Sequence, residues 1–283
     1  MKVLVTGANG QLGKSLYKIK DRYPEIEYIF TDIEELDITN QEEVNDFFRK
    51  HKPDYCINTA AYTNVDKAES EIELNYKVNS TGPENLAVAC VKYPTKLIHI
   101  SSDYVYNNDS DEIMTESHKT FPKGEYAKSK LEGENKIKNI LSNYYIIRTS
   151  WLYSEFGNNF ISTILRLCKE RTVLNVVDDQ IGSPTYATDL AEAIMKIIKS
   201  DTGLTGIYNF SNNGYASWYD FAKKIIEFSK MNCKINPIPT SEYPTPAPRP
   251  RNSKMSKKKF IDNFKIDIKN WEESLKRCIN QLI

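Results

Sequence analysis

Three glycines near the amino terminus constrain this chain more than any other feature of its sequence. Gly7, Gly10 and Gly13 follow a short apolar segment, residues 3–6, and open an amphipathic stretch over residues 11–21. This order predicts a β-strand that turns tightly into an α-helix. The first glycine permits the turn, and the last lets the helix pack closely against a sheet. We therefore expect an α/β fold from the outset.

The first half of the chain repeats this strand–helix pattern. We predict apolar strands at residues 3–6, 28–31, 55–59, 96–101 and 144–148, and helices at 11–21, from about 41 to Pro53, 81–92 and 125–141. Thr39 to Glu42 has the arrangement of a capping box, which begins the second helix. Such repeats predict a parallel, doubly wound sheet of the Rossmann type.

The second half is less regular. We predict helices at residues 158–170, 187–199, 217–230 and 271–282, strands near 173–177 and 206–210, and an extended proline-rich loop from Pro237 to Pro250. We expect a Rossmann core over residues 1–150. Residues 151–283 should form mainly a small carboxyl-terminal lobe, with some segments returning to the core sheet.

Composition excludes several classes of protein. The 38 basic and 38 acidic residues cancel, which argues against a nucleic-acid or membrane partner. No apolar run approaches the roughly 20 residues of a membrane span. The five cysteines are scattered and never paired as C-x-x-C, which is typical of reduced thiols in the cytoplasm. The three histidines lie far apart, so no protein-bound metal is predicted.

The glycine turn also predicts a dinucleotide site. A helix that begins at such a turn offers unpaired N–H groups to a pyrophosphate. A lone glycine turn can be purely structural, but here it stands between a strand and a helix, as cofactor binding requires. The residues that we expect to bind the cofactor in this turn are Gly7, Asn9, Gly10, Gln11, Leu12 and Gly13.

Residues after the second and third strands should complete the cofactor site. Asp32 is placed to accept hydrogen bonds from the adenosine ribose. It would repel a 2′-phosphate, which favours NADH over NADPH. An ordinary solvated acid is the alternative. Asp37 and Ile38 should flank the adenine, and the small segment that follows the third strand lets the cofactor lie close to the backbone. That segment contributes Ala60, Ala61 and Tyr62.

A catalytic set is predicted where the fourth strand ends. Tyr126 and Lys130 stand four residues apart on a predicted helix and so share one face. The pair alone is common on exposed helices, and Ser102 alone could be a turn or cap residue. In this order, however, Ser102 can orient a carbonyl, Tyr126 can donate a proton to its oxygen, and Lys130 can lower the pKa of Tyr126. Both helix residues would also contact the cofactor.

Together these segments resemble the extended short-chain dehydrogenase/reductases and, within them, the branch of 4-dehydrorhamnose reductases. The resemblance rests on residues 7–13, 36–39, 58–63, 65–69, 101–106, 148–153, 157–160, 179–185 and 248–253. It implies a substrate-binding lobe and the reduction of the C4 keto group of dTDP-4-dehydro-L-rhamnose. NADPH or NADH would be the cofactor of that reaction.

The resemblance also implies a substrate site, made of Ser102, Asp103, Tyr104, Trp151, Asn159 and Arg249. Trp151 would pack an aromatic face on the 6-deoxy sugar, with core filling as the alternative. Arg249, with Arg251 and Lys254, would meet the nucleotide diphosphate, with solvated surface charge as the alternative. Some relatives bind Mg²⁺ between subunits, but no residue here can be matched to such a site. A homodimer stays open.

Three positions depart from the family. Ser102 stands where the family usually has threonine, which keeps the hydroxyl, and Ala127 follows Tyr126 where the family usually has glycine. Residues 253–259, near the expected nucleotide, are more basic than usual, and this third departure leaves the substrate open. A reductase of another nucleotide-linked 4-keto-6-deoxy sugar is therefore an alternative. A non-catalytic relative, the regulatory subunit of methionine adenosyltransferase, is a second alternative. The intact Ser102, Tyr126 and Lys130 favour an enzyme.

Overall fold

Six parallel strands form the central sheet of the protein in a computed structural model, which describes residues 1–106 and 111–283. In spatial order they are β10 (Gly206–Asn209), β5 (Tyr144–Thr149), β4 (Lys96–Ser102), β3 (Tyr55–Asn58), β1 (Lys2–Thr6) and β2 (Glu27–Thr31). The chain crosses from one side of β1 to the other between β2 and β3. The predicted doubly wound Rossmann-type sheet is confirmed.

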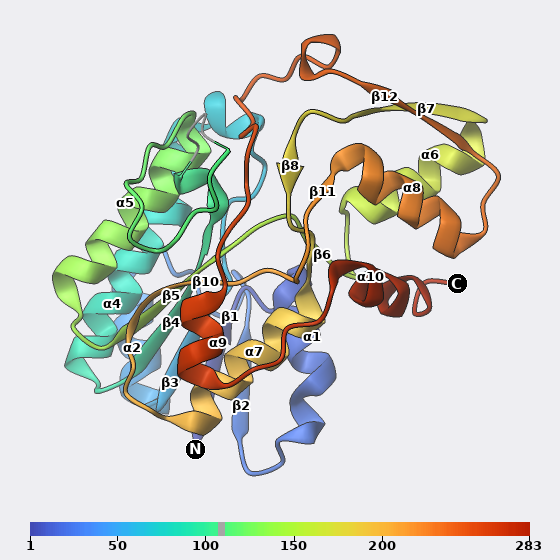
Figure 1. Ribbon diagram of the computed structural model, residues 1–283. Coiled ribbons are helices and arrows are strands. Elements are labelled where there is room, and N and C mark those ends of the chain that lie inside the picture. The colour runs from blue at the N-terminus through green and yellow to red at the C-terminus, as the bar shows by residue number, and fades with distance from the viewer. Residues whose placement is uncertain (107–110) are drawn as a thin grey trace.

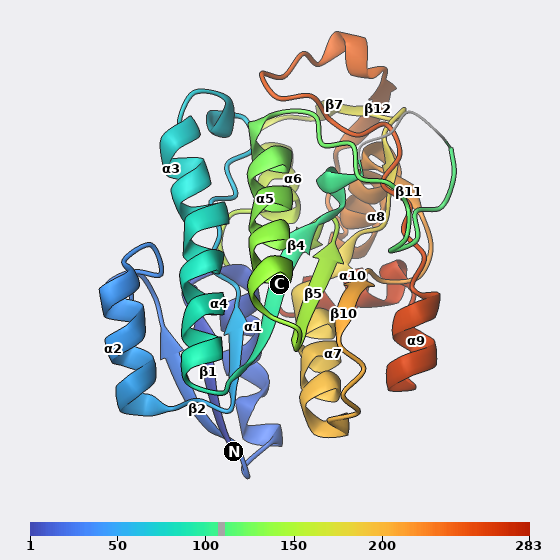
Figure 2. The ribbon, with the colours of Figure 1, turned by 90° about the vertical axis from the view of Figure 1, so that its left-hand side faces the viewer.

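Helices cover both faces of the sheet (Figures 1 and 2). One face carries α2 (Gln41–His51), α4 (Gly82–Lys92) and α5 (Glu125–Ile140), and the other carries α1 (Gln11–Ile19), α7 (Ala187–Ser200) and α9 (Lys258–Phe264). Alternate side chains of each strand point to opposite faces. On β1, Val3 and Val5 join the α7 side, while Leu4 joins the α4 side.

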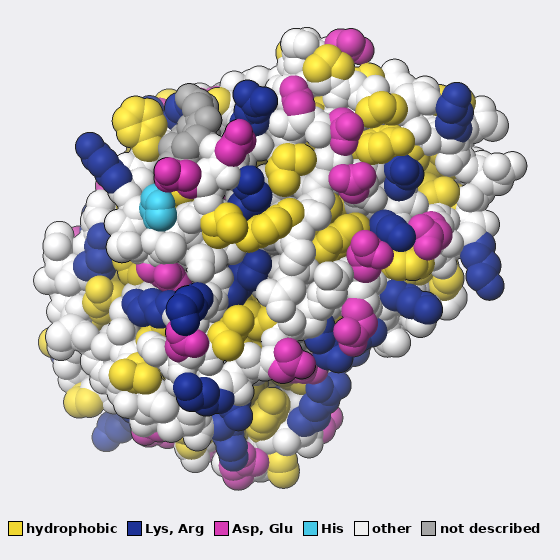
Figure 3. Space-filling view, in the orientation of Figure 1, with side chains coloured by type: hydrophobic (Ala, Val, Ile, Leu, Met, Phe, Trp, Pro, Cys, Tyr) yellow, Lys and Arg dark blue, Asp and Glu magenta, His cyan; other side chains and the backbone are white. Residues whose placement is uncertain are grey.

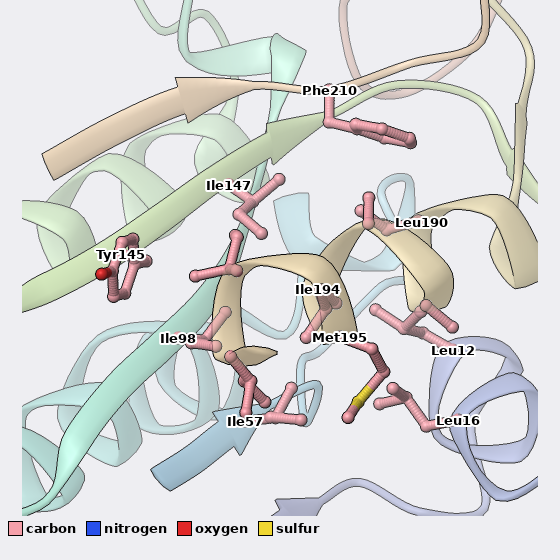
Figure 4. Close-up of a cluster of buried hydrophobic side chains, with 14 of the residues drawn as sticks. Leu12, Leu16, Ile57, Ile98, Tyr145, Ile147, Leu190, Ile194, Met195 and Phe210 are labelled. Carbon is pink, nitrogen blue, oxygen red and sulfur yellow. The ribbon is translucent and has the colours of Figure 1, made fainter. Parts of the chain in front are cut away.

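The larger of these two cores lies under α7. Figure 4 shows Leu190 and Ile194 of α7 in one cluster with Ile57 and Ile98 of the sheet. All four side chains are fully buried. Because α7 and β10 come from the second half of the chain, that half completes the core as well as building the lobe.

The lobe has its own hydrophobic core beside the sheet (Figure 1). Its main elements are α6 (Phe160–Glu170), β7 (Val173–Val177), α8 (Trp218–Ser229), β12 (Lys234–Ile238) and α10 (Trp271–Ile279). Two short strand pairs join it to the core: β6 (Leu152–Tyr153) with β9 (Thr185–Tyr186), and β8 (Ile181–Gly182) with β11 (Ala216–Ser217). The lobe therefore meets the sheet at the end where the strands finish.

A continuous helical run precedes β4. It consists of α3 (Ile72–Tyr76), the π-helical turn η3 (Lys77–Thr81) and α4, so the helix predicted at residues 81–92 begins earlier than expected. A Cβ on Gly133 of α5 would lie only 2.2 Å from the Asn79 carbonyl oxygen. Glycine thus lets α5 lie directly against η3. The remaining short turns are η1 (Lys20–Arg22), η2 (Lys67–Glu69), η4 (Asp103–Val105) and η5 (Thr240–Glu242).

The capping prediction for α2 is off by one residue. The Asn40 side chain, not Thr39, caps the helix, accepting from the N–H groups of Glu42 and Glu43. The Thr39 hydroxyl instead donates to Asp37 at 2.7 Å. Asparagine competes well for the cap position, and a neighbouring carboxylate engages the threonine.

Among the elements that were not expected from the sequence are β12 and α9. β12 includes Pro237, inside the segment predicted as an extended loop. Among the described residues, β12 pairs only with β7, so Pro237, which has no N–H group, can be placed at the open edge of this strand pair. The second element, α9, buries Phe260 and Phe264, which stand one helical turn apart in a lysine-rich segment. This short apolar face was not predicted because the segment around it is rich in charged residues.

The surface agrees with the balanced composition. Basic and acidic side chains are interspersed over the face drawn in Figure 3. Among the described residues, no helix combines the length and the apolar character that crossing a membrane would take.

Candidate active site

A cavity of about 1030 Å³ opens where the core strands end and the lobe begins. The glycine turn, the ends of β3, β4 and β5, and α5 line it from the core, while α6 and α8 line it from the lobe. Ligands of doubly wound sheets bind at this edge, outside the carboxyl ends of the strands. Of the predicted site residues, all but Gly13 and Arg249 line this cavity.

The glycine turn is shaped to receive phosphate groups. Gly7 has a φ of +68°, and a Cβ there would lie 2.5 Å from the Ala60 nitrogen. α1 starts at Gly10 with no side-chain cap among the described residues and no acid in its first turn. Its first N–H groups are therefore available to an anion beside the cavity. Gly13 acts in packing, because a Cβ would lie 2.5 Å from the Cα of Ala8.

Gln11 joins the glycine turn to the lobe. Its Oε1 accepts from Ser154 Oγ at 2.9 Å and from Asn159 Nδ2 at 3.0 Å. Asn159 also caps α6 by accepting from the Ser162 N–H at 3.2 Å. Both Gln11 and Asn159 line the cavity as predicted, but their side chains hold the two parts of the chain together.

Asp32 faces the cavity with both carboxylate oxygens already engaged. Oδ2 accepts from the Asn9 N–H at 2.8 Å, and Oδ1 accepts from the Ile33 N–H at 2.9 Å. The carboxylate thus supports the backbone of the glycine turn. Each oxygen still has a further lone pair for a ribose hydroxyl. Asp37, Ile38, Ala60, Ala61 and Tyr62 continue the same wall.

Ser102, Tyr126 and Lys130 meet in one cavity, although they come from two elements. Ser102 ends β4, and the other two lie on adjacent turns of α5. Lys130 Nζ donates to the Ile100 carbonyl oxygen at 2.8 Å. The Tyr126 ring packs edge-on against Tyr104, with ring centroids 5.6 Å apart. The two α5 side chains are therefore held against the end of β4.

Burial dominates the titration of this set. It raises the pKa of Tyr126 to about 12, and the Ser102 hydroxyl offsets only part of the rise. Burial also lowers the pKa of Lys130 to about 8, against the opposing charge of Glu134. The lowered Tyr126 pKa that we expected from Lys130 is not found in the ligand-free protein. Tyr126 is protonated at neutral pH, which is the form that can donate a proton.

Asp103 is a buried acid next to the catalytic set. It is 3% exposed, and its Oδ1 accepts from Ser102 Oγ at 3.1 Å. Burial raises its pKa to about 6, while the hydroxyls of Ser102 and Ser253 pull it down. A carboxyl whose pKa rises on folding binds more protons in the folded state, so the unfolding free energy falls as pH rises through about 4 to 6.

Asp103→Asn is expected to remove this pH dependence. Two pH units at about 1.4 kcal/mol each give a loss of ~3 kcal/mol in the wild type, complete above about pH 6. The free energy of unfolding of the variant, relative to that of the wild type, should therefore increase as pH rises from 4 to 7. Urea unfolding at pH 4 and at pH 7 would measure this change. Parallel stability profiles for the two proteins would contradict the assignment.

Trp151 lines the cavity with both of its faces covered. One face stacks on Trp218, with ring centroids 3.5 Å apart and planes 8° from parallel. A Cβ on Gly182 would lie 2.6 Å from indole Cε2, 2.8 Å from Nε1 and 2.9 Å from Cζ2, which places Gly182 over the other face. The indole can thus offer only an edge to a ligand. The expected packing of its face on a sugar does not fit this arrangement.

Arg249 does not enter the cavity. Its Nη2 donates to Asp66 Oδ2 at 2.7 Å, and the Ala247 N–H donates to Oδ1 of the same carboxylate. Lys254 Nζ donates to the Asp111 carbonyl oxygen at 2.8 Å, and Arg251 is exposed. In this structure, these basic residues tie loops together outside the predicted nucleotide site.

Several cavity residues were missed by the sequence. Among those from the core are Val65, Leu74, Lys77, Val78 and Thr149, and among those from the lobe are Phe160, Trp218 and Phe221. The helix predicted at residues 217–230 is α8, and a capping box from Ser217 to Asp220 marks its start. No sequence signal shows that Trp218, the next residue, turns toward Trp151.

No metal site accompanies the cavity. Among residues 1–106 and 111–283, no three His, Cys, Asp or Glu side chains gather as metal ligands would. The Mg²⁺ that the resemblance raised therefore has no ligand set in the described part of the chain.

The sequence and structure match known proteins over their full length. A family model described as RmlD substrate binding domain covers residues 1–283. A dTDP-4-dehydrorhamnose reductase of Aggregatibacter actinomycetemcomitans is 40% identical over 97% of each chain. The crystal structure of a dTDP-4-dehydrorhamnose reductase from Clostridium acetobutylicum is 42% identical with a TM-score of 0.95, covering 100% of this chain and 99% of that one. The Bacillus anthracis enzyme, solved in complex with NADP, is 42% identical with a TM-score of 0.94 over 99% of each chain.

Proposed function

The chain belongs to the RmlD substrate-binding-domain family, and from this premise we propose that it reduces the C4 keto group of dTDP-4-dehydro-L-rhamnose to give dTDP-L-rhamnose. It is an NAD(P)H-dependent oxidoreductase of nucleotide-sugar biosynthesis. The observation that carries the proposal is the meeting of Ser102, Tyr126 and Lys130 in one cavity with the glycine turn.

The residues of the cavity fit a dinucleotide. The uncapped start of α1 would hold the pyrophosphate, and Asp32 would accept from the adenosine ribose. Lys130 has donors to spare beyond its bond to Ile100 and would reach the nicotinamide ribose. When bound, the reduced nicotinamide supplies the hydride.

The protein's own side chains would then complete the reduction. The Ser102 hydroxyl orients the keto oxygen, where negative charge develops as the carbonyl carbon is reduced. Tyr126 gives its phenolic proton to that oxygen, and the Lys130 ammonium stabilises the tyrosinate that remains. Trp151, clamped between Trp218 and Gly182, would present a fixed indole edge to the sugar.

The site bears differently on the two alternative functions. A reductase of another 4-keto-6-deoxy nucleotide sugar would use the same three residues and differ only in its contacts to the sugar and nucleotide. A non-catalytic binding protein would have no need of a buried proton donor beside a strand-end serine. The cytoplasmic location and the homodimer stay predictions; all five cysteines are free, in keeping with the first.

A substrate panel tests the proposal. NADH and NADPH would each be assayed by absorbance with dTDP-4-dehydro-L-rhamnose and with other nucleotide-linked 4-keto-6-deoxy sugars. We expect stoichiometric cofactor oxidation with the first substrate and dTDP-L-rhamnose as the product identified by NMR. Turnover of only another nucleotide sugar would support the first alternative. Absence of turnover on every dTDP-linked substrate would reject the proposal.

A further inference from the structure

A buried ion pair lies beneath the proposed catalytic helix and has no part in the steps above. Arg148 of β5 holds Glu134 of α5 through two contacts, Nε to Oε1 at 2.9 Å and Nη2 to Oε2 at 2.6 Å. Glu134 is 0% exposed and Arg148 is 2% exposed. Because burying two charges removes their water, such a pair often stabilises a protein no better than apolar side chains would. Stability alone therefore does not explain it.

Glu134 continues the catalytic stripe of α5. Tyr126, Lys130 and Glu134 follow one another at intervals of four residues, so their side chains lie on one face of the helix. The first two line the cavity, and the third lies one turn deeper. The Glu134 carboxylate is thus the nearest acid to Lys130 on its own helix.

β4 contacts this stripe with consecutive residues. The Ile100 carbonyl oxygen accepts from Lys130 Nζ at 2.8 Å, and Ser101 Oγ donates to Glu134 Oε1 at 2.6 Å. The next residue is Ser102, whose side chain belongs to the cavity. Glu134 is therefore fixed to the same strand end that positions both Lys130 and Ser102.

The charged and titratable groups around Lys130 come from several elements. His99 of β4 and Glu134 of α5 interact electrostatically with Lys130, and Arg148 of β5 pairs with Glu134. Three further groups line the same cavity as Lys130: Tyr126 of α5, Asp103 of η4 and Lys77 of η3. Burial and the charge of Lys130 lower the pKa of His99 well below its usual value, so this imidazole is neutral. Burial lowers the pKa of Lys130 to about 8. Of the surrounding carboxylates, Glu134 is the one whose charge opposes this decrease.

We propose that Glu134, oriented by Arg148 and Ser101, is a positioning residue that keeps Lys130 in its ammonium form beside Tyr126. The inference rests on the proposed reductase function, because that reaction needs the ammonium. A neutral Lys130 amine would not stabilise the tyrosinate, and it would bind the nicotinamide ribose more weakly than the ammonium does. The carboxylate never touches the substrate and acts only through Lys130.

Glu134→Gln tests the inference because it keeps the shape of the side chain and removes its charge. Arg148 would then add an uncompensated positive charge near Lys130, and the lysine would lose its proton at lower pH. We expect the alkaline limb of kcat/KM to move down by about one pH unit. From a pKa of about 8, that shift lowers the activity at pH 8 roughly fivefold. Activity near pH 6.5 should be largely retained.

Two further variants separate charge from folding. Glu132→Gln changes a half-exposed acid on another face of α5, which contacts Ser80 Oγ at 2.7 Å, and should leave the pH profile in place. The double variant Glu134→Gln/Arg148→Met removes both buried charges and provides a folded protein if Glu134→Gln alone is unstable. Its alkaline limb should fall between those of the wild type and Glu134→Gln.

The pH dependence of NADH affinity provides a readout that does not need turnover. Fluorescence titrations between pH 6 and 9.5 should show the affinity weakening at lower pH in Glu134→Gln than in the wild type. If the wild type reduces no keto sugar, the proposed function fails, while this titration still decides the role of Glu134. A uniform loss of rate with unmoved limbs in both measurements would overturn the inference and leave Glu134 a structural residue.

Discussion

Replacing Tyr126 with phenylalanine is expected to lower kcat for keto-sugar reduction by about 10²- to 10⁴-fold, the usual contribution of a positioned acid. The affinity for NAD(P)H should change little, because the ring and its packing against Tyr104 are kept. Stopped-flow and steady-state assays with the natural cofactor would measure kcat, and fluorescence titration would measure binding.

The environment of Tyr126 suits it to give a proton rather than to take one. Burial raises its pKa to about 12, so the phenol is fully protonated at neutral pH before the reaction starts. Charge developing on the keto oxygen then makes that oxygen the stronger base. In the proposed mechanism, the Lys130 ammonium stabilises the tyrosinate only as it forms, so its effect belongs to the transition state and not to the resting protein.

A matched control is a tyrosine of α3 that contacts the same helix, α5. Tyr76 donates its hydroxyl to Glu125, the first residue of α5, at 3.2 Å, and it lies outside the cavity lining. Tyr76→Phe removes a phenol next to α5 without touching the proposed acid, so kcat should stay within about twofold of the wild type. Near-native turnover by Tyr126→Phe would show that another group supplies the proton.

The core and its cavity are predictable because their signals are local. Gly7 needs a positive φ and Gly13 needs close packing, and both constraints are properties of a strand–turn–helix unit that the sequence shows directly. Parallel strands then bring their ends to one edge, so the positions of Ser102 and Tyr126 relative to the turn follow from topology alone.

The partners of long polar and aromatic side chains are not predictable in this way. Arg249 forms a hydrogen-bonded ion pair with Asp66, 183 positions away in the sequence, and Trp151 packs against both Trp218 and Gly182. Each of these contacts depends on how the lobe docks on the core, which no periodicity encodes. Sequence can therefore place such residues near the site without deciding which groups they contact.

The buried ion pair of Arg148 and Glu134 is likewise not predictable from the sequence. Arg148 ends an apolar strand and Glu134 lies in a helix rich in lysine and glutamate, so neither stands out as a buried charge. Only the pairing of β4 with β5, which sets Ser101 beside Arg148, brings the guanidinium under α5. Tertiary structure turns two ordinary charges into a feature of the site.

Arg148→Met is expected to lower the free energy of unfolding by about 3–5 kcal/mol, the usual cost of leaving one buried charge without its partner. Methionine fills much of the same volume, so most of the loss should come from the Glu134 carboxylate. Of the side-chain hydrogen bonds that the Glu134 carboxylate now accepts, only the one from Ser101 Oγ would remain. Urea unfolding at pH 7 would measure the change.

The double variant Glu134→Gln/Arg148→Met separates the stranded charge from lost packing. It removes both charges of this pair and should regain most of the lost stability, giving a coupling energy well above the ~0.5 kcal/mol of independent sites. The defect of Arg148→Met should also shrink as pH falls and the carboxylate takes up a proton. If the single and double variants are equally unstable at every pH, the loss instead reflects packing of the guanidinium over the Tyr106 ring, 4.7 Å from its centroid.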